Sequence, residues 1–158
     1  MMKVGIGYDV HRLVPNRPLI LGGVKIPFDK GLDGHSDADV VVHAMSDALL
    51  GAVALGDIGY YFPDTDQKNK DLDSLLILKR ALQIVFEEGY ILNNFDVVIH
   101  VERPKISPFV QDMRKKLAEV LSIEISCIGV KATTTEGLGF VGREEGIAAQ
   151  AICSVVKK

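Results

Sequence analysis

The alternation of side chains along residues 2–13 constrains the fold more than any other feature of this sequence. Apolar residues take one face of the segment, and the opposite face carries Gly5, Gly7, Asp9 and His11. A repeat of two residues is the period of a β-strand. We therefore predict a strand that presents a carboxylate and an imidazole on the same side.

Asp9 and His11 form the first candidate site. An Asp-x-His pair with one further histidine is a sufficient ligand set for Zn²⁺ and leaves a fourth position open for a substrate. The small glycines at 5 and 7 would leave space around the pair. The alternative is a solvent-facing strand with an incidental polar pair, and the pair taken alone favours that alternative.

A helix is predicted over residues 38–55. Most of its residues are apolar, which is typical of a helix buried nearly all round. Ser36, with Asp39 three residues later and an apolar run beyond, has the spacing of a capping box, so we expect the helix to begin there.

The polar exceptions in this helix are Asp39, His43, Ser46 and Asp47. Their spacing puts them on one stripe, and a polar stripe on a buried helix must face a partner, a ligand or a cavity. Asp39 or Asp47 could accept the second imidazole proton of His43 and hold its tautomer. His35 lies in a glycine-rich loop at the helix start, so both His35 and His43 remain open as the third metal ligand.

The remaining segments continue a mixed order of strands and helices. We expect a strand or hairpin at 18–27, loops at 28–37, 56–73 and 103–108, helices at 73–88 and 108–120, strands at 95–102 and 126–135, and a glycine-rich connection at 136–146. The period of residues 147–158 fits a strand or a helix. We find no repeat or linker, so residues 1–158 are expected to form a single domain.

Composition excludes several classes of protein. The net charge of −3 argues against nucleic acid as the main partner. No apolar run reaches the ~18 residues of a membrane span, and the first residues lack the pattern of a targeting peptide. The two cysteines, Cys127 and Cys153, lie in apolar strand-like runs and are expected to be buried free thiols. We therefore expect a cytoplasmic protein.

Residues 137–142, GLGFVG, match the G-x-G-x-x-G pattern of dinucleotide-binding proteins. That interpretation requires a βαβ unit and an acidic residue about 20 positions later, and the chain ends too soon after Gly142. The glycines are better explained by a close approach of the backbone to a ligand or another subunit.

Residues 131–136, KATTTE, are a candidate phosphate site. Threonine hydroxyls and loop amides could hold phosphate oxygens, and Glu136 could bind Mg²⁺ together with them. Lys105 is a candidate cation for the same phosphates. The alternative is that the threonines are there only because β-branched residues favour strands, and that Lys105 is solvated.

Five stretches together resemble one family over essentially the whole chain. They are GYDVHRL, LDGHSDADVVVHAMSDALLGA, LGDIGYYFPDTD, RPKISP and VKATTTEGLGFVGREEGIAA. They are similar to the 2-C-methyl-D-erythritol 2,4-cyclodiphosphate synthases. The resemblance implies an α/β (α+β) fold, with a mixed four- to five-stranded sheet packed on one face by helices, and a homotrimer with active sites between subunits. It also implies conversion of 4-diphosphocytidyl-2-C-methyl-D-erythritol 2-phosphate to the cyclic diphosphate, with release of CMP, in the non-mevalonate route to isoprenoids.

The resemblance also assigns roles to residues. Asp9, His11 and His43 match zinc ligands, and Glu136 matches the ligand of Mg²⁺ or Mn²⁺. His35 and Thr134 are the expected catalytic residues at the phosphates. The expected substrate contacts are Ser36, Asp57, Ile58, Gly59, Phe62, Pro63, Asp64, Thr65, Asp66, Pro104, Lys105, Ile106, Ala132, Thr133, Phe140 and Arg143. The cytidine and α-phosphate pocket of an adjoining subunit is matched by Pro104, Lys105, Ile106, Ala132, Thr133 and Thr134. Phe140 and Arg143 match positions near the trimer axis.

Two other functions fit parts of the same pattern. A zinc-dependent phosphohydrolase could use the same three ligands with a water in the fourth position and Glu136 or Asp39 as a base. A non-catalytic nucleotide-binding trimer could carry the zinc as a structural ion, and would then need a fourth protein ligand, for which His35 is the only candidate.

Overall fold

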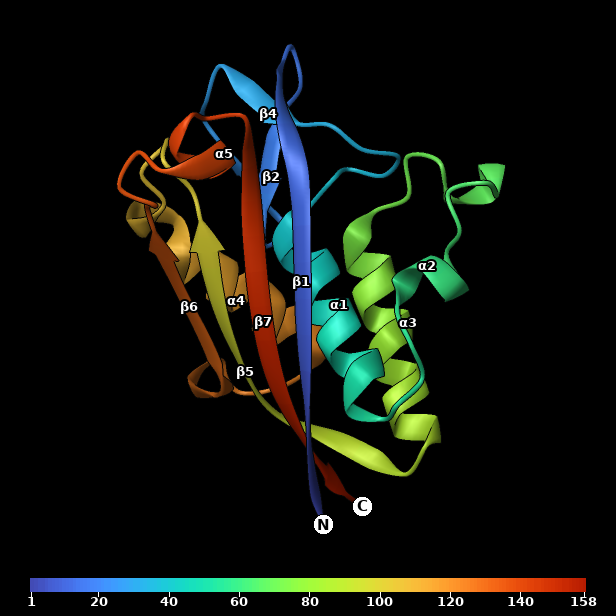
Figure 1. Ribbon diagram of the computed structural model, residues 1–158. Helices are drawn as coiled ribbons and strands as arrows, with labels where there is room; N and C mark the ends of the chain where they lie inside the picture. The colour runs from blue at the N-terminus through green and yellow to red at the C-terminus, as the bar shows by residue number, and fades with distance from the viewer.

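The computed structural model describes residues 1–158, and its centre is a five-stranded mixed sheet (Figure 1). The strands lie in the order β4-β1-β7-β5-β6. Their bounds are Lys30–Leu32 for β4, Met2–Pro15 for β1, Gly146–Lys157 for β7, Tyr90–His100 for β5 and Ile128–Thr133 for β6. Only β5 and β6 run parallel, and the other neighbours are antiparallel. The predicted mixed sheet is therefore confirmed.

Helices cover one face of this sheet (Figure 1). The three long helices are α1 (Val40–Ala52), α3 (Ser74–Glu87) and α4 (Val110–Leu121). The short helices are α2 (Ile58–Tyr61), α5 (Gly139–Gly142), η1 (Gln67–Asn69), η2 (Ser107–Phe109) and η3 (Ile125–Cys127). A small hairpin of β2 (Leu19–Leu21) and β3 (Val24–Ile26) completes the fold. None of the helices combines the length and the apolar character needed to cross a membrane.

Helix α1 packs directly on β1, and two glycines make that contact possible. A Cβ added to Gly7 would lie 1.9 Å from the carbonyl oxygen of Ala44, and one added to Gly5 would lie 1.9 Å from that of Ala48. The sequence suggested that these glycines leave space around Asp9 and His11, but the helix backbone fills that space. This close packing brings residues of α1 within reach of the side chains of β1.

The other face of the sheet is uncovered in the single chain. Apolar side chains of β1 point to it, with Val4 57% exposed, Ile6 64% and Tyr8 51%, and Ile152 of β7 is 46% exposed. The alternation predicted for residues 2–13 is thus confirmed, but its apolar side chains are the exposed ones. Because soluble monomers rarely expose a large contiguous apolar patch, this face has the character of an interface.

Several predicted elements differ from the observed ones. The capping box at Ser36 is wrong: Ala38 takes φ 56°, and the helix starts after Asp39, whose carboxylate accepts a hydrogen bond from the amide of Val42. Strand β4 lies in the predicted loop 28–37, and α2 and η1 lie in the predicted loop 56–73. Residues 147–158, left open between helix and strand, belong to β7.

Candidate active site

Asp9 and His11 of β1 and His43 of α1 converge on one point. Their ligating atoms all lie within 4.8 Å of one another. Asp9 Oδ2 is 2.9 Å from His11 Nε2 and 3.1 Å from His43 Nδ1, and the two imidazole nitrogens are 3.2 Å apart. Two imidazoles and a carboxylate at such separations are a donor set that suits a divalent metal ion. The geometry therefore makes His43, not His35, the third residue of the candidate metal site.

The second nitrogen of each imidazole has its own partner. His11 Nδ1 donates to the carbonyl oxygen of Asp33 at 2.8 Å. His43 Nε2 lies 2.9 Å from Ser74 Oγ and 3.2 Å from Ser36 Oγ. Each ring is thus held in orientation by the protein, as is usual for histidines that bind metals.

The carboxylates of Asp39 and Asp47 do not contact His43, so the prediction that one of them holds its tautomer is wrong. Asp39 is fully buried and accepts hydrogen bonds from the amides of Gly22 and Gly23 at 2.9 and 2.7 Å. Asp47 accepts one from the amide of Ile58 at 2.8 Å. Because an α-helix repeats every 3.6 residues, Asp39 and Asp47 lie on sides of α1 that are next to that of His43 but distinct from it. Their hydrogen bonds attach the segments around Gly22 and Ile58 to α1 instead.

Asp9 Oδ2 and His11 Nε2 lie 2.9 Å apart, so each group shifts the pKa of the other. Burial acts against the charge of Asp9, but the neighbouring imidazoles of His11 and His43 outweigh it and lower the pKa of Asp9. Burial likewise favours neutral His11, yet the hydrogen bond and charge of Asp9 raise its pKa. The lowered pKa keeps Asp9 negatively charged at the point where a cation would bind.

The three residues open into a cavity of about 450 Å³. Its walls include His35 and Ser36 from the loop before α1. They also include five of the residues expected around the substrate: Ile58, Gly59, Phe62, Pro63 and Asp64. Asp57, Thr65 and Asp66 are not part of these walls. Asp57 and Asp66 instead cap α2 and η1, where they accept hydrogen bonds from the amides of Tyr60 and Lys68.

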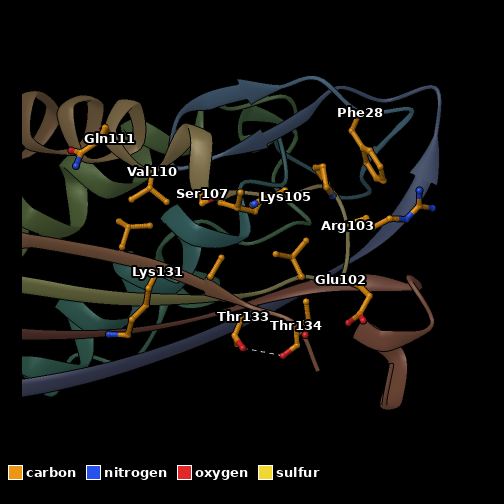
Figure 2. Close-up of a pocket in the computed structure, with 15 residues that line it drawn as sticks. Phe28, Glu102, Arg103, Lys105, Ser107, Val110, Gln111, Lys131, Thr133 and Thr134 are labelled. Carbon is orange, nitrogen blue, oxygen red and sulfur yellow. Dashed lines mark hydrogen bonds between the residues drawn. The ribbon is translucent and has the colours of Figure 1, made fainter. Parts of the chain in front are cut away.

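A second cavity, of about 990 Å³, lies between the end of β5, the start of α4 and β6 (Figure 2). Its lining contains all the residues expected for a nucleotide pocket: Pro104, Lys105, Ile106, Ala132, Thr133 and Thr134. Phe28, Glu102 and Arg103 also line it, as Figure 2 shows. The two cavities share no lining residue.

Glu136, Phe140 and Arg143 line neither cavity. Glu136 is exposed at φ 55°, in a turn whose amides are held by Glu102. The carboxylate of Glu102 accepts hydrogen bonds from the amides of Thr135 and Gly137, both at 3.2 Å. One chain alone thus brings together the predicted zinc ligands but does not bring Glu136 to them.

Comparison with known proteins identifies the family. The model of the YgbB family matches residues 2–156 of this chain. The chain belongs to the YgbB family. A relative from Salinibacter ruber, named 2-C-methyl-D-erythritol 2,4-cyclodiphosphate synthase, is 59% identical over 154 residues, which are 98% of each chain. A relative of the same name from Clostridium botulinum is 57% identical over 157 residues, which are 99% of this chain and 100% of that one.

Solved structures agree with this membership. A 2C-methyl-D-erythritol-2,4-cyclodiphosphate synthase in a CDP-bound form superposes with a TM-score of 0.90 at 36% identity, over 98% of this chain and 100% of that one. The Plasmodium falciparum IspF–CDP complex gives 0.88 at 32% identity, over 99% and 97%. The bifunctional IspDF of Campylobacter jejuni gives 0.97 at 44% identity over 100% of this chain, which spans 43% of that longer protein.

In this member of the YgbB family, sequence reasoning missed the side chains behind His43. Ser74 contacts the imidazole, and Asp37 contacts Ser74. Asp73 and Ser74 stand at the start of a predicted helix and have the composition of a helix cap, which Asp73 indeed supplies. That local role gave no indication that Ser74 also reaches a residue 31 positions away.

Proposed function

We propose that the protein converts 4-diphosphocytidyl-2-C-methyl-D-erythritol 2-phosphate into 2-C-methyl-D-erythritol 2,4-cyclodiphosphate and releases CMP, as a phosphorus–oxygen lyase of the non-mevalonate isoprenoid route. The observation that carries the proposal is the convergence of Asp9, His11 and His43 at the wall of a cavity. The names of its YgbB relatives support the same activity. The two free cysteines agree with a cytoplasmic location, which is part of the proposal.

The candidate ligands fit two metal sites of different kinds. We assign Zn²⁺ to Asp9, His11 and His43, because imidazole nitrogens with a carboxylate suit it and a fourth position stays open for a phosphate oxygen. We assign Mg²⁺ or Mn²⁺ to Glu136, whose single carboxylate needs substrate phosphates to complete the coordination. When bound, the metals would neutralise the phosphate oxygens that repel each other and make phosphorus more electrophilic.

The protein then has mainly to align the substrate. An oxygen of the 2-phosphate attacks the β-phosphorus, the bond from that phosphorus to the oxygen it shares with the α-phosphate breaks, and CMP leaves with the electron pair. Because the attacking group is in the same molecule and already anionic, the protein has to fold the substrate back on itself and needs no general base.

In this proposal each of the two cavities binds a different part of the substrate. In the smaller cavity, His35 and Ser36 can donate hydrogen bonds to phosphate oxygens. The wall residues between Ile58 and Asp64 can hold and cover the methylerythritol part. In the larger cavity, Lys105 and the hydroxyls of Thr133 and Thr134 can hold the nucleotide and its α-phosphate.

We further propose that the active protein is a homotrimer in which each site combines the two cavities from neighbouring chains. The cavities share no lining residue, and the apolar side chains of Val4, Ile6 and Tyr8 leave one face of the sheet exposed for contact with further copies. In this arrangement Glu136 reaches the phosphates at the subunit boundary, and Phe140 and Arg143 lie near the threefold axis.

The products of the reaction test the proposal. The purified protein, supplied with the diphosphocytidyl substrate, Zn²⁺ and Mg²⁺, should release CMP and the cyclic diphosphate in equal amounts, measured by ³¹P NMR. The His43→Ala variant should retain no zinc and no activity. A linear phosphate product would indicate a hydrolase instead, and nucleotide binding without turnover would indicate a binding protein; either result refutes the proposed function.

A further inference from the structure

Ser74, the first residue of α3, lies behind the metal-ligand cluster and is fully buried. Its Oγ contacts His43 Nε2 at 2.9 Å and also contacts a carboxylate oxygen of Asp37. Asp37 is itself fixed, since its carboxylate accepts hydrogen bonds from the amides of Ser74 and Asp39, each at 3.2 Å. A chain of contacts thus runs from Asp37 through Ser74 to the imidazole of His43.

The protons available on Asp37, Ser74 and His43 determine the direction of each hydrogen bond between them. A serine hydroxyl has one proton to donate and two lone pairs that accept. The carboxylate of Asp37 accepts only, so the hydroxyl proton of Ser74 is directed to it. Towards His43 the oxygen of Ser74 then offers a lone pair, and the proton in that contact has to come from Nε2.

A neutral imidazole that carries its proton on Nε2 has its only free lone pair on Nδ1. His43 Nδ1 is the atom that faces Asp9 Oδ2 at 3.1 Å and His11 Nε2 at 3.2 Å. His11 follows the same rule with its nitrogens exchanged, because its Nδ1 donates to the carbonyl oxygen of Asp33 and leaves Nε2 free. The two histidines therefore present different nitrogens to one metal.

Ser36 also lies near Nε2, at 3.2 Å, but its surroundings differ from those of Ser74. Its Oγ accepts a hydrogen bond from the amide of Ala38, and the residue lines the cavity. No carboxylate takes its hydroxyl proton. Because the hydroxyl proton of Ser74 is directed to Asp37, Ser36 can donate only to Ser74 Oγ, at 3.4 Å, or to an oxygen atom of a ligand in the cavity.

We infer that Ser74, oriented by Asp37, is a positioning residue for His43: it accepts the Nε2 proton, fixes the tautomer and ring orientation, and directs Nδ1 to the metal. This inference rests on the metal site of the proposed function. Outer partners of metal-binding histidines typically contribute 10- to 100-fold to metal affinity, and we expect a loss of about that size when the hydroxyl of Ser74 is removed.

The test measures the Zn²⁺ affinity of the full-length protein by competition with a chromophoric chelator. Ser74→Ala should bind Zn²⁺ about 10- to 100-fold more weakly than the wild type. The matched control is Ser46→Ala, which removes a buried hydroxyl that donates to the carbonyl oxygen of Val42 in the same helix as His43. That variant should bind Zn²⁺ as the wild type does, within about threefold.

A spectroscopic readout separates positioning from a general loss of structure. In the Co²⁺-loaded protein, the ring proton on His43 Nε2 should give a hyperfine-shifted ¹H NMR signal that exchanges slowly with D₂O. Ser74→Ala should speed its exchange, and Ser46→Ala should not. If Ser74→Ala does not fold, Asp37→Asn carries the test, because it weakens the anchor of Ser74 and should also lower the Zn²⁺ affinity.

The outcomes are distinct for the two proposals. A wild-type protein that binds no Zn²⁺ would refute the metal site of the proposed function. Tight binding by the wild type, with equally tight binding and an unchanged Nε2 proton in Ser74→Ala, would overturn only the role of Ser74. Wild-type affinity in a folded Asp37→Asn variant would overturn the role of Asp37 as its anchor.

Discussion

At the metal ligands, a proton and a metal ion compete for the same lone pair. The pKa of His11 lies above its ordinary value of 6.5: burial favours the neutral form, but Asp9 outweighs it. Metal binding requires neutral imidazole and so releases this proton. Below the raised pKa of His11, the Zn²⁺ affinity should therefore fall by about tenfold per pH unit.

Titration with Zn²⁺ at several pH values between 5.5 and 8 checks this, after correction for the pH dependence of the competing chelator. An affinity that stays constant over that range would mean that His11 carries no proton in the metal-free protein, and would contradict the raised pKa.

Glu136 is the residue whose assignment depends most on the assembled protein, since it lines neither cavity of one chain. Glu136→Gln keeps the size of the side chain and removes its charge, so it should raise the Mg²⁺ concentration needed for half-maximal activity by about tenfold or more. Zinc content, measured by elemental analysis, should remain at the wild-type level. Loss of zinc from this variant would show that the two metal sites have been interchanged.

At the scale of elements, the contact between α1 and β1 determines whether His43 reaches Asp9. Gly7→Ala would bring a Cβ to 1.9 Å from the carbonyl oxygen of Ala44. Since the obstacle is backbone, the strand and helix must separate, and we expect a loss of at least about 3 kcal/mol in the free energy of unfolding.

Gly51→Ala is the matched control in the same helix, because its Cβ would meet only the carbonyl oxygen of Ile6 at 3.7 Å, an ordinary contact. It should stabilise the protein by about 0.5 kcal/mol through its higher helix propensity. Urea unfolding of both variants measures the difference. Equal stabilities would mean that α1 does not rest on β1 as closely as described.

The turn that carries Thr134 and Glu136 depends on Glu102. A glutamine at this position offers one accepting oxygen for two amides, so one of the hydrogen bonds from Thr135 and Gly137 is lost. Glu102→Gln should speed hydrogen exchange at these amides by about tenfold or more, as expected for a bond to a charged group. Glu119→Gln, on the exposed side of α4, should leave their exchange unchanged, and the same rates in both variants would contradict the role of Glu102.

Periodicity predicts the elements that local sequence controls. The period of two in residues 2–13 places Asp9 and His11 on one face, and the apolar run in 38–55 predicts a buried helix, as found. Strand β4 was missed because its three residues in a glycine-rich loop are extended only by pairing with the far end of β1. The contacts of Ser74 were missed because they join it to residues 36–43, more than 30 positions away, and periodicity carries no information on contacts between distant segments.

At the scale of the whole molecule, the proposed trimer makes each active site dependent on two chains. A variant with Asp9→Ala and a variant with Lys105→Ala should each be inactive alone. After unfolding and refolding together in equal amounts, they should regain about a quarter of wild-type activity, because a quarter of the boundaries then pair an intact Asp9 with an intact Lys105.

Mass spectrometry of the intact assembly establishes whether the subunits have mixed, and light scattering gives the molar mass. If mixed trimers form and no activity returns, the two cavities do not combine into one site. A monomeric molar mass in an active preparation would contradict the shared site in the same way.

In the proposed reaction, metal ions held by this chain remove the repulsion between the two ends of a doubly phosphorylated substrate. The most direct test is the rate of CMP release by protein from which every divalent ion has been removed by chelation, verified by elemental analysis. We predict a loss of at least about a thousandfold, since charge neutralisation accounts for several kcal/mol of the barrier, with recovery on adding Zn²⁺ and Mg²⁺ together. An undiminished rate in the metal-free protein would show that the reaction does not depend on bound metal ions.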